Sequence, residues 1–305
     1  MSFSNSVRID SCLYLLLLFP QIGLPVAEEE LGNHYSPPNI YRFANHLFEE
    51  QDYWRAADEY QRYLRQELGN VGTDSIMFKI GLCYYYAYYF AEAAKTYREL
   101  IDLYPESNLI DKSHILVALI LLKMGDDNAL TVYIEQINTE HMTPRARSEI
   151  MFLGGLGYLY TYRWSDAEKN FRELSSHESC PQDLQKLSRR LEKIALQGES
   201  LKKKSPIFAG FLSALVPGLG RVYLNRQGGG VFSLLMVGVM GYSAYVSFAA
   251  RGVASVNGWI FAISAVPLYL GNIYGSAVGA DVYNMKQREE LLDQVQFSID
   301  DLIQF

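Results

Sequence analysis

The pattern of hydrophobic and polar positions divides this chain into two parts. Up to about residue 204, apolar residues recur at helical spacing among many charged ones, which is typical of amphipathic helices in water. From Ser205 to Ala280 the chain is nearly uncharged and holds long apolar runs. The mean hydropathy of -0.04 averages over these two regions. The sequence therefore predicts an all-α protein in which a water-exposed helical part precedes a membrane segment.

Four segments of the first part share one pattern, which joins two helices through a short turn. Each has an apolar helix, a polar turn, an alanine, and an aromatic residue four positions after the alanine. The alanines are Ala56, Ala93, Ala129 and Ala167, which are separated by 37, 36 and 38 residues. The aromatic residues that follow them are Tyr60, Tyr97, Tyr133 and Phe171. The third segment matches the pattern least well.

These segments resemble the tetratricopeptide repeat (TPR) family, whose unit is about 34 residues. The resemblance extends to Gly81 in the second segment and to Gly155 in the fourth. It implies a TPR-like helical solenoid of about four repeats over residues 38–180, because one helix pair cannot bury its own apolar face. Residues 181–204 are expected to form a capping helix and a basic linker. The apolar positions of the cap are Leu184, Leu187, Leu191 and Ile194.

The TPR resemblance also implies which side chains face a concave groove. The first-helix positions expected there are Tyr41, Asn45, Phe48, Phe78, Leu82, Tyr85, Tyr86, Phe152, Leu156 and Tyr160. This stripe is aromatic and apolar, and it lacks the basic residues with which some family members clamp a C-terminal carboxylate. Aromatic grooves are common binding surfaces, so the stripe favours capture of a hydrophobic peptide or protein. The alternative is that many of these tyrosines pack between neighbouring repeats.

Two apolar runs in the second part are long enough to cross a bilayer. Neither Val231–Ala250 nor Trp259–Ala280 holds a charge, and a helix of about 20 residues spans the hydrocarbon core. A third uncharged stretch, Ser205–Gly220, would reach only about 24 Å, so a full span competes with a re-entrant or interfacial helix. We expect two to three membrane helices within residues 205–284. Residues 285–305 follow as an amphipathic, acidic tail helix.

A second resemblance lies at the start of the membrane segment. The residues PGLG at 217–220, Tyr223 and the glycines at 228–230 are similar to the signature of a family of small bacterial two-helix membrane domains. This resemblance implies membrane insertion more than any particular activity. In the last apolar run, glycines recur every four residues, at Gly271, Gly275 and Gly279. Such a ridge predicts packing against the neighbouring span or self-association into a homo-oligomer.

The N-terminus is typical of a secretory signal peptide. An apolar run from Cys12 to Phe19 precedes small residues, so residues 1–27 are predicted to be the signal peptide and residues 28–37 a linker. A signal peptide favours export of the repeats to the periplasmic side of a bacterial membrane. With two spans, the flanking basic residues favour the cytoplasm for the same part under the positive-inside rule. With three spans the charges balance, and export remains compatible with them.

Composition and motifs point away from catalysis and nucleic-acid binding. The net charge of -7 argues against a nucleic-acid partner, which requires clustered Lys and Arg. The five histidines are scattered, the three cysteines show no CxxC spacing, and the chain has no phosphate-binding loop or nucleophile motif. We therefore expect that the protein is not an enzyme and that it holds no metal or cofactor.

The combination of predicted repeats and membrane helices favours a membrane-anchored scaffold of the bacterial cell envelope. Its partners would be proteins bound in the groove and the lipid bilayer, and its work would be the assembly of complexes. The alternative is a subunit of a membrane transport or insertion machine. In that case the membrane helices act and the repeats regulate.

Overall fold

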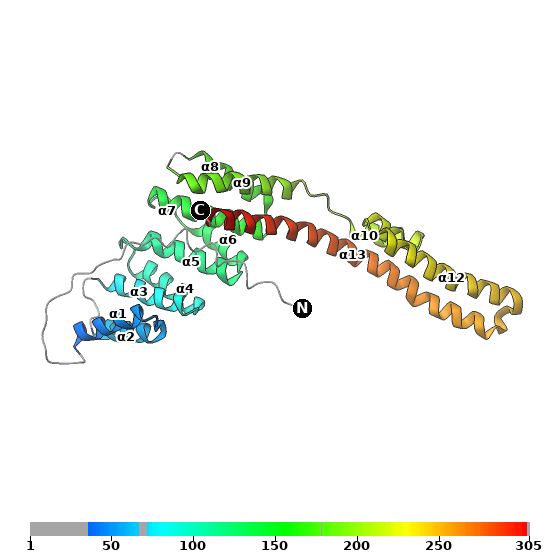
Figure 1. Ribbon diagram of the computed structural model, residues 1–305, viewed down its shortest axis with the longest axis horizontal. Helices are drawn as coiled ribbons and strands as arrows, with labels where there is room; N and C mark the ends of the chain where they lie inside the picture. The colour runs from blue at the N-terminus through cyan, green and yellow to red at the C-terminus, as the bar shows by residue number, and fades with distance from the viewer. Residues whose placement is uncertain (1–35, 67–71, 178, 304–305) are drawn as a thin grey trace. The chain divides into compact units, whose positions relative to one another are not determined.

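The protein is all-helical and forms two compact units (Figure 1). The structure is a computed structural model, and the residues that it describes are 36–66, 72–177 and 179–303, with side chains to Gln296. Among the described residues, unit 1 contains those up to Glu199 and those from Gln294 onward, and unit 2 consists of Ser200–Asp293. The described residues contain no strand. The predicted signal peptide and nearly all of the predicted linker lie outside the described residues.

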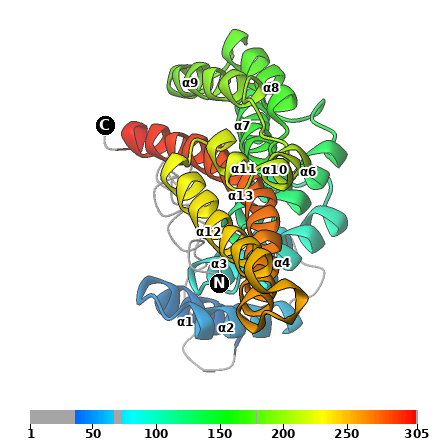
Figure 2. The ribbon, with the colours of Figure 1, turned by 90° about the vertical axis from the view of Figure 1, so that its right-hand side faces the viewer.

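Unit 1 is a series of helices in which each packs against the next along the chain (Figures 1 and 2). The helices are α1 (Pro37–Glu49), α2 (Tyr53–Gln66), α3 (Thr73–Tyr86), α4 (Phe90–Leu103), α5 (Ile110–Met124), α6 (Asp127–Gln136), α7 (Pro144–Tyr160), α8 (Trp164–Ser176) and α9 (Gln182–Glu199). In addition, α7 contacts both α5 and α9. The apolar stripes of the sequence therefore meet in one helical, repeat-like packing.

The turns between paired helices repeat one backbone geometry at a constant interval. At intervals of 37 residues, left-handed φ angles between 60° and 69° occur at Gln51, Tyr88, Gly125 and Tyr162. The next residue of each turn donates its amide N–H to the carbonyl five positions earlier, as from Asp126 to Leu121 at 3.1 Å. This hydrogen bond and the left-handed residue are characteristic of the Schellman helix end. The turn geometry is therefore the same in the third segment, where the sequence pattern is weakest.

Small residues let the two helices of a pair approach closely. At the same interval of 37 residues, the first helices carry Ala44, Gly81, Ala118 and Gly155, all buried. A Cβ atom on Gly81 would lie 2.6 Å from the Tyr97 ring, and one on Gly155 would lie 2.5 Å from the Phe171 ring. Real Cβ atoms do not approach so closely, so these two pairs require glycine at the contact.

The constant interval corrects the alignment of the third segment. The sequence pattern places Ala129 at the alanine position and Tyr133 at the aromatic position. The structure instead places Leu130 and Ile134 there, 37 residues after the equivalent positions of the second segment. Leu130 is fully buried, and its amide donates to the carbonyl of Asp126 at 2.9 Å. The sequence alignment of the third segment is therefore wrong by one residue. Ala129 and Tyr133 match the residue types of the pattern, but the turn sets which positions pack between the helices.

Helix α9 covers α8 at the end of the stack, where the sequence predicts a cap. It also packs against α7. Its buried side chains include all four of the predicted apolar positions, Leu184, Leu187, Leu191 and Ile194. Near its end, Gly198 lies against the Trp164 ring, where any Cβ atom would clash. The helical spacing of these residues therefore identified the buried face correctly.

Unit 2 contains two helices that are long and apolar enough to cross a membrane. Its elements are α10 (Pro206–Leu215), α11 (Leu219–Tyr223), α12 (Gln227–Arg251), the 3-10 helix η1 (Gly252–Ala254) and most of α13 (Val256–Ile303). Apolar side chains on α12 and α13 are exposed, as at Phe232 (62%) and Ile263 (66%). Helix α10 has ten residues, about 15 Å, which is half the hydrocarbon core. The predicted tail helix is continuous with α13.

Buried polar groups attach α10 to α13 within unit 2. The Ser213 hydroxyl donates to the Ser276 hydroxyl at 2.7 Å, and both residues are fully buried. The Asn272 side-chain amide donates to the Ser213 carbonyl at 3.3 Å, and the Tyr269 hydroxyl donates to the Ala214 carbonyl at 2.5 Å. In apolar surroundings such hydrogen bonds are costly to leave unmade, so they hold α10 alongside α13.

Candidate interaction surfaces

The predicted groove residues divide into buried and half-buried sets. The buried set is Phe78, Tyr85, Phe152 and Leu156, with exposures from 0% to 6%. The half-buried set is Tyr41, Asn45, Phe48, Leu82, Tyr86 and Tyr160. A fully buried side chain such as Leu156 presents no area to a partner in this conformation. Contact with a partner can therefore involve only the half-buried set directly.

Several of the half-buried aromatic residues contact one another between successive helices. The Phe48 ring lies 5.3 Å from Tyr53 and 6.0 Å from Tyr86, measured between ring centres. Tyr53 and Tyr86 stack at 5.1 Å. Burial raises the pKa of both tyrosines above the usual value, so they remain neutral. These rings have a packing role between α1, α2 and α3, and their outer edges remain accessible.

Two lysines lie beside the predicted groove residues. Lys79 donates from Nζ to the Tyr41 hydroxyl at 2.8 Å and to Asn45 Oδ1 at 2.7 Å. Lys123 lies with Nζ 5.3 Å from the centre of the Tyr85 ring. Neither lysine is among the expected groove positions, which skip Lys79 and include no residue of the third segment, where Lys123 lies. The stripe therefore carries positive charge that the sequence pattern did not show.

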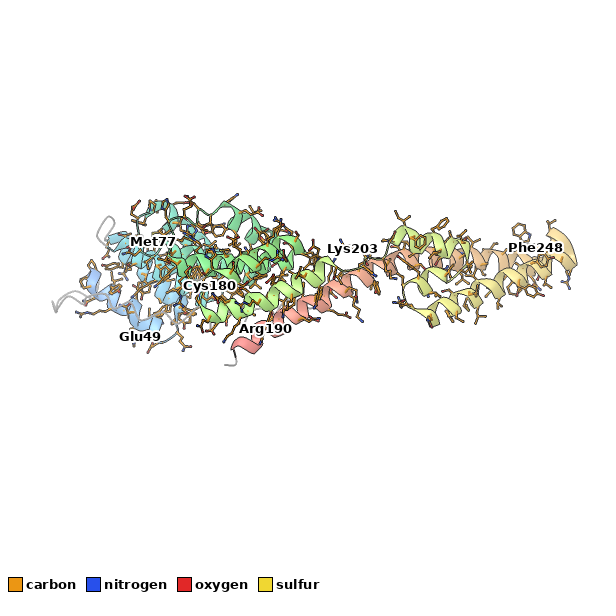
Figure 3. The ribbon with its side chains drawn as sticks, turned by 90° about the horizontal axis from the view of Figure 1, so that it is seen from above. Glu49, Met77, Cys180, Arg190, Lys203 and Phe248 are labelled. Carbon is orange, nitrogen blue, oxygen red and sulfur yellow. The ribbon has the colours of Figure 1, made fainter. Side chains whose placement is uncertain are left out.

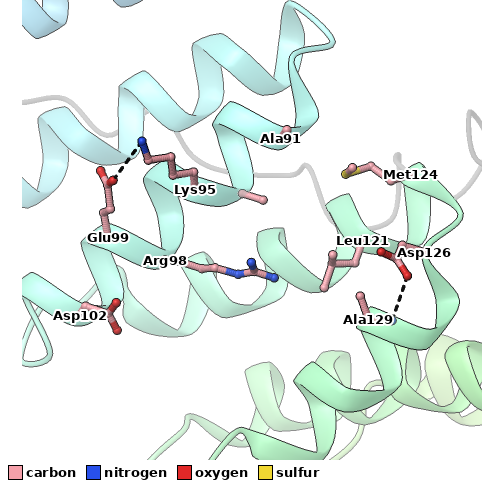
Figure 4. Close-up of a pocket in the computed structure, with 10 residues that line it drawn as sticks. Ala91, Lys95, Arg98, Glu99, Asp102, Leu121, Met124, Asp126 and Ala129 are labelled. Carbon is pink, nitrogen blue, oxygen red and sulfur yellow. Dashed lines mark hydrogen bonds and ion pairs between the residues drawn. The ribbon is translucent and has the colours of Figure 1, made fainter.

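A cavity of about 400 Å³ lies on another part of unit 1, between α4, α5 and α6 (Figure 4). Its lining is Ala91, Ala94, Lys95, Arg98, Glu99, Asp102, Leu121, Met124, Asp126 and Ala129. Lys95 pairs with Glu99 at 3.8 Å, and the Arg98 guanidinium lies 5.5 Å from the centre of the Tyr133 ring. None of the predicted groove residues lines this cavity. Its charged lining residues therefore make different contacts, one within the lining and one with an aromatic ring outside it.

Burial shifts the pKa of a cysteine and of a histidine in unit 1. Burial raises the pKa of the Cys83 thiol to about 12, so the thiol stays protonated and unreactive. Burial lowers the pKa of His114, whose Nδ1 lies 2.8 Å from the Tyr133 hydroxyl. Among the described residues, no group of three His, Cys, Asp or Glu side chains could hold a metal ion.

The glycine ridge of the last apolar run faces different neighbours along its length. A Cβ atom on Gly279 would lie 3.0 Å from Leu224, just after α11, and one on Gly275 would lie 3.5 Å from the Arg221 guanidinium. Nothing lies within 4 Å of a Cβ atom on Gly271. The ridge therefore packs partly against the α11 region, and its Gly271 end is open. Self-association through that end stays a prediction.

The chain matches no protein-family model, and no curated protein shows a significant match to it. The geometry of the two units is therefore the main guide to function.

Proposed function

We propose that this protein is a membrane-anchored scaffold of the TPR type, in which unit 1 binds protein partners and unit 2 anchors the chain in a bilayer. The observation that carries the proposal is the presence, in one chain, of repeat-like helix pairs and two bilayer-length helices with exposed apolar side chains. The 37-residue turn interval and the Gly81–Tyr97 and Gly155–Phe171 contacts support the TPR assignment. Assembly of cell-envelope complexes is the role we infer for such a scaffold.

The partner surface is the half-buried set together with Lys79 and Lys123. Exposed edges of Tyr41, Phe48 and Tyr86 offer apolar contact area. Lys79 adds positive charge beside Tyr41, and Lys123 adds it beside Tyr85. Aromatic side chains supply large contact area at low cost in conformational entropy. This chemistry fits a hydrophobic peptide segment that carries an acidic residue.

In-cell photo-crosslinking tests this surface with a matched pair of positions. A photoreactive residue at Tyr86 on α3 is expected to capture a discrete set of proteins. The same residue at Leu103, which is 64% exposed on α4, is expected to capture none of them. Substitution of Lys79 by Ala should weaken the capture from position 86. Identical products from both positions, or none from position 86 with helix content unchanged, would refute the surface.

A second function follows from the buried polar groups of unit 2. Asn272 is 3% exposed, and its Oδ1 has no hydrogen-bond partner among the described residues. Polar side chains within membrane helices often mark a transport path, so we also consider a subunit of a transport or insertion machine. A chain ending at Glu199 distinguishes the two functions, provided that its helix content shows it to be folded, because the cut also removes Gln294–Phe305 of unit 1. Retained partner binding supports the scaffold, whereas loss of all activity supports the machine.

The side of the membrane that carries unit 1 depends on the number of spans. We propose two spans, α12 and α13, because the ten residues of α10 are too few to cross. Two spans leave the chain before α12 and the end of α13 on one side. The predicted signal peptide favours export of that side, and the flanking basic residues favour the cytoplasm. Labelling of a cysteine placed at Leu103 with a membrane-impermeant reagent in intact cells distinguishes these sides.

A further inference from the structure

Basic side chains gather at one end of the helices of unit 2. From Ser200 to Ala280 the chain has six Lys and Arg residues and no Asp or Glu. Five of them precede α12, and we call these five the basic collar: Lys202, Lys203, Lys204, Arg221 and Arg226. The sixth, Arg251, ends α12, whose 25 residues place its two ends about 37 Å apart. Figure 3 labels Lys203 at one end of unit 2 and Phe248 near the other.

Tertiary contacts hold the two sequence segments of the collar together. The backbone amide of Ser205 donates to the Tyr223 hydroxyl at 3.3 Å, and Lys204 Nζ lies 4.4 Å from the centre of the Tyr223 ring. The Asn284 side chain of α13 accepts from the Lys204 amide and donates to the Lys204 carbonyl, both at 2.8 Å. The basic linker is therefore fixed beside α11 and α13, although it is far from Asn284 in the sequence.

The Arg221 side chain has a backbone carbonyl as its hydrogen-bond partner, with no carboxylate paired to it among the described residues. Its Nη1 lies 3.5 Å from the Gly229 carbonyl oxygen. Its Nη2 is close to Gly275, since a Cβ atom added to that glycine would lie 3.5 Å from it. Among the described residues, none of the five collar side chains forms an ion pair with Asp or Glu. The first acidic residue after the collar is Asp281. A half-buried guanidinium without a carboxylate is stabilised when an anion is supplied from outside.

Exposed apolar side chains lie on the helices that follow the two segments of the collar or carry it. On α10, Ile207 is 85% exposed and Phe211 is 56% exposed, and on α11 Val222 is 40% exposed. Apolar side chains next to Tyr, Lys and Arg are typical of the boundary between the hydrocarbon core and the headgroups. Lipid phosphates are the anions present at this boundary.

We propose that the basic collar binds the headgroups of anionic phospholipids, with Arg221 and Lys204 at its centre. The binding rests on the proposed function, because the collar meets headgroups only when α12 and α13 enter a bilayer. The guanidinium of Arg221 provides paired donors for phosphate oxygens, and Lys202 and Lys203 add long-range attraction. Increasing salt weakens the attraction of the exposed lysines more than that of the half-buried Arg221.

Lipid analysis of the purified full-length chain tests the proposal. The chain is reconstituted in phosphatidylcholine alone and in an equal mixture of phosphatidylcholine and phosphatidylglycerol, extracted in mild detergent, and analysed for retained lipid. We expect phosphatidylglycerol to be enriched over phosphatidylcholine. Substitution of Arg221 by Gln should lower this enrichment about fivefold, as for loss of one charge at an anionic surface. The matched variant Arg251→Gln, which removes one charge from the other end of α12, should keep it.

The outcomes separate failure of the lipid site from failure of the anchor. Insertion into both membranes with no phosphatidylglycerol enrichment overturns headgroup binding and leaves the anchor intact. Failure to insert into either membrane overturns the anchor as well. An equal loss in the Arg221→Gln and Arg251→Gln variants shows general charge attraction and overturns the collar as a site. Loss of enrichment with inorganic phosphate at constant ionic strength indicates a free-phosphate site and overturns the lipid assignment.

Discussion

The left-handed turns between paired helices allow a stability prediction that involves almost no side-chain contact. Gly125 has a φ angle of 69°, and nothing lies within 4 Å of a Cβ atom added there. Substitution of Gly125 by Ala therefore has only a conformational effect. A residue with a Cβ atom loses about 1–2 kcal/mol in the left-handed region, and the stiffer unfolded chain offsets about 0.4–1 kcal/mol. We expect a net destabilisation of about 1 kcal/mol.

The equivalent position of the first helix pair provides the reverse substitution. Gln51 has a φ angle of 64°, and its side chain is exposed. Substitution of Gln51 by Gly relieves the same conformational strain and should stabilise the protein by up to about 1 kcal/mol. Tyr88 and Tyr162 are less suitable, because each also contacts another ring.

Urea and thermal unfolding of the full-length protein in mild detergent measure both effects. The fluorescence of Trp54 and Trp164 reports on unit 1, in helices α2 and α8. For a unit of this size, each kilocalorie per mole corresponds to a shift of about 2–4 °C in the unfolding midpoint. The Gly125→Ala variant should unfold earlier than the unsubstituted protein, and the Gln51→Gly variant should unfold at the same point or later. An unchanged or later midpoint for Gly125→Ala would refute the left-handed turn, and with it the constant interval.

Three further predictions concern buried or half-buried positions. The Gly155→Ala variant places a Cβ atom against the fully buried Phe171. The clash should lower the free energy of unfolding in urea by about 1–3 kcal/mol, and the higher helix propensity of alanine should offset about 1 kcal/mol of this loss. The control Gly271→Ala, where nothing lies near the added Cβ atom, should not lower it. Because burial lowers the pKa of His114 from 6.5, the unfolded chain binds more protons below that pH. The urea midpoint should therefore fall as the pH drops below 6.5 and level off below the pKa of His114 in the folded protein. An equal dependence of the midpoint on pH in the His114→Asn variant contradicts this. Cys83, fully buried with a pKa of about 12, should resist iodoacetamide until urea unfolds the chain; native modification at the rate of a free thiol refutes its burial.

The predicted groove shows where sequence reasoning was insufficient. The family pattern identifies which first-helix positions face one side, but it does not give the depth of each side chain. Phe152 and Leu156 are buried, whereas Tyr41 and Tyr86 keep exposed edges, because burial depends on how closely neighbouring helix pairs approach. The charge of Lys79 beside Tyr41 was also missed, because it is brought there by contact between α1 and α3.

The helical class, the buried face of α9 and the two apolar runs of α12 and α13 can all be predicted from local sequence. These features follow from the 3.6-residue period and from local composition, which are properties of neighbouring residues. Tertiary structure alone decided the alignment of the third segment, where the turn at Gly125 sets the interval and the residue types mislead. It also placed α10 against α13 and brought Lys204 to Asn284, 80 positions away. Such long-range hydrogen bonds depend on the folded path of the chain, and no local pattern contains them.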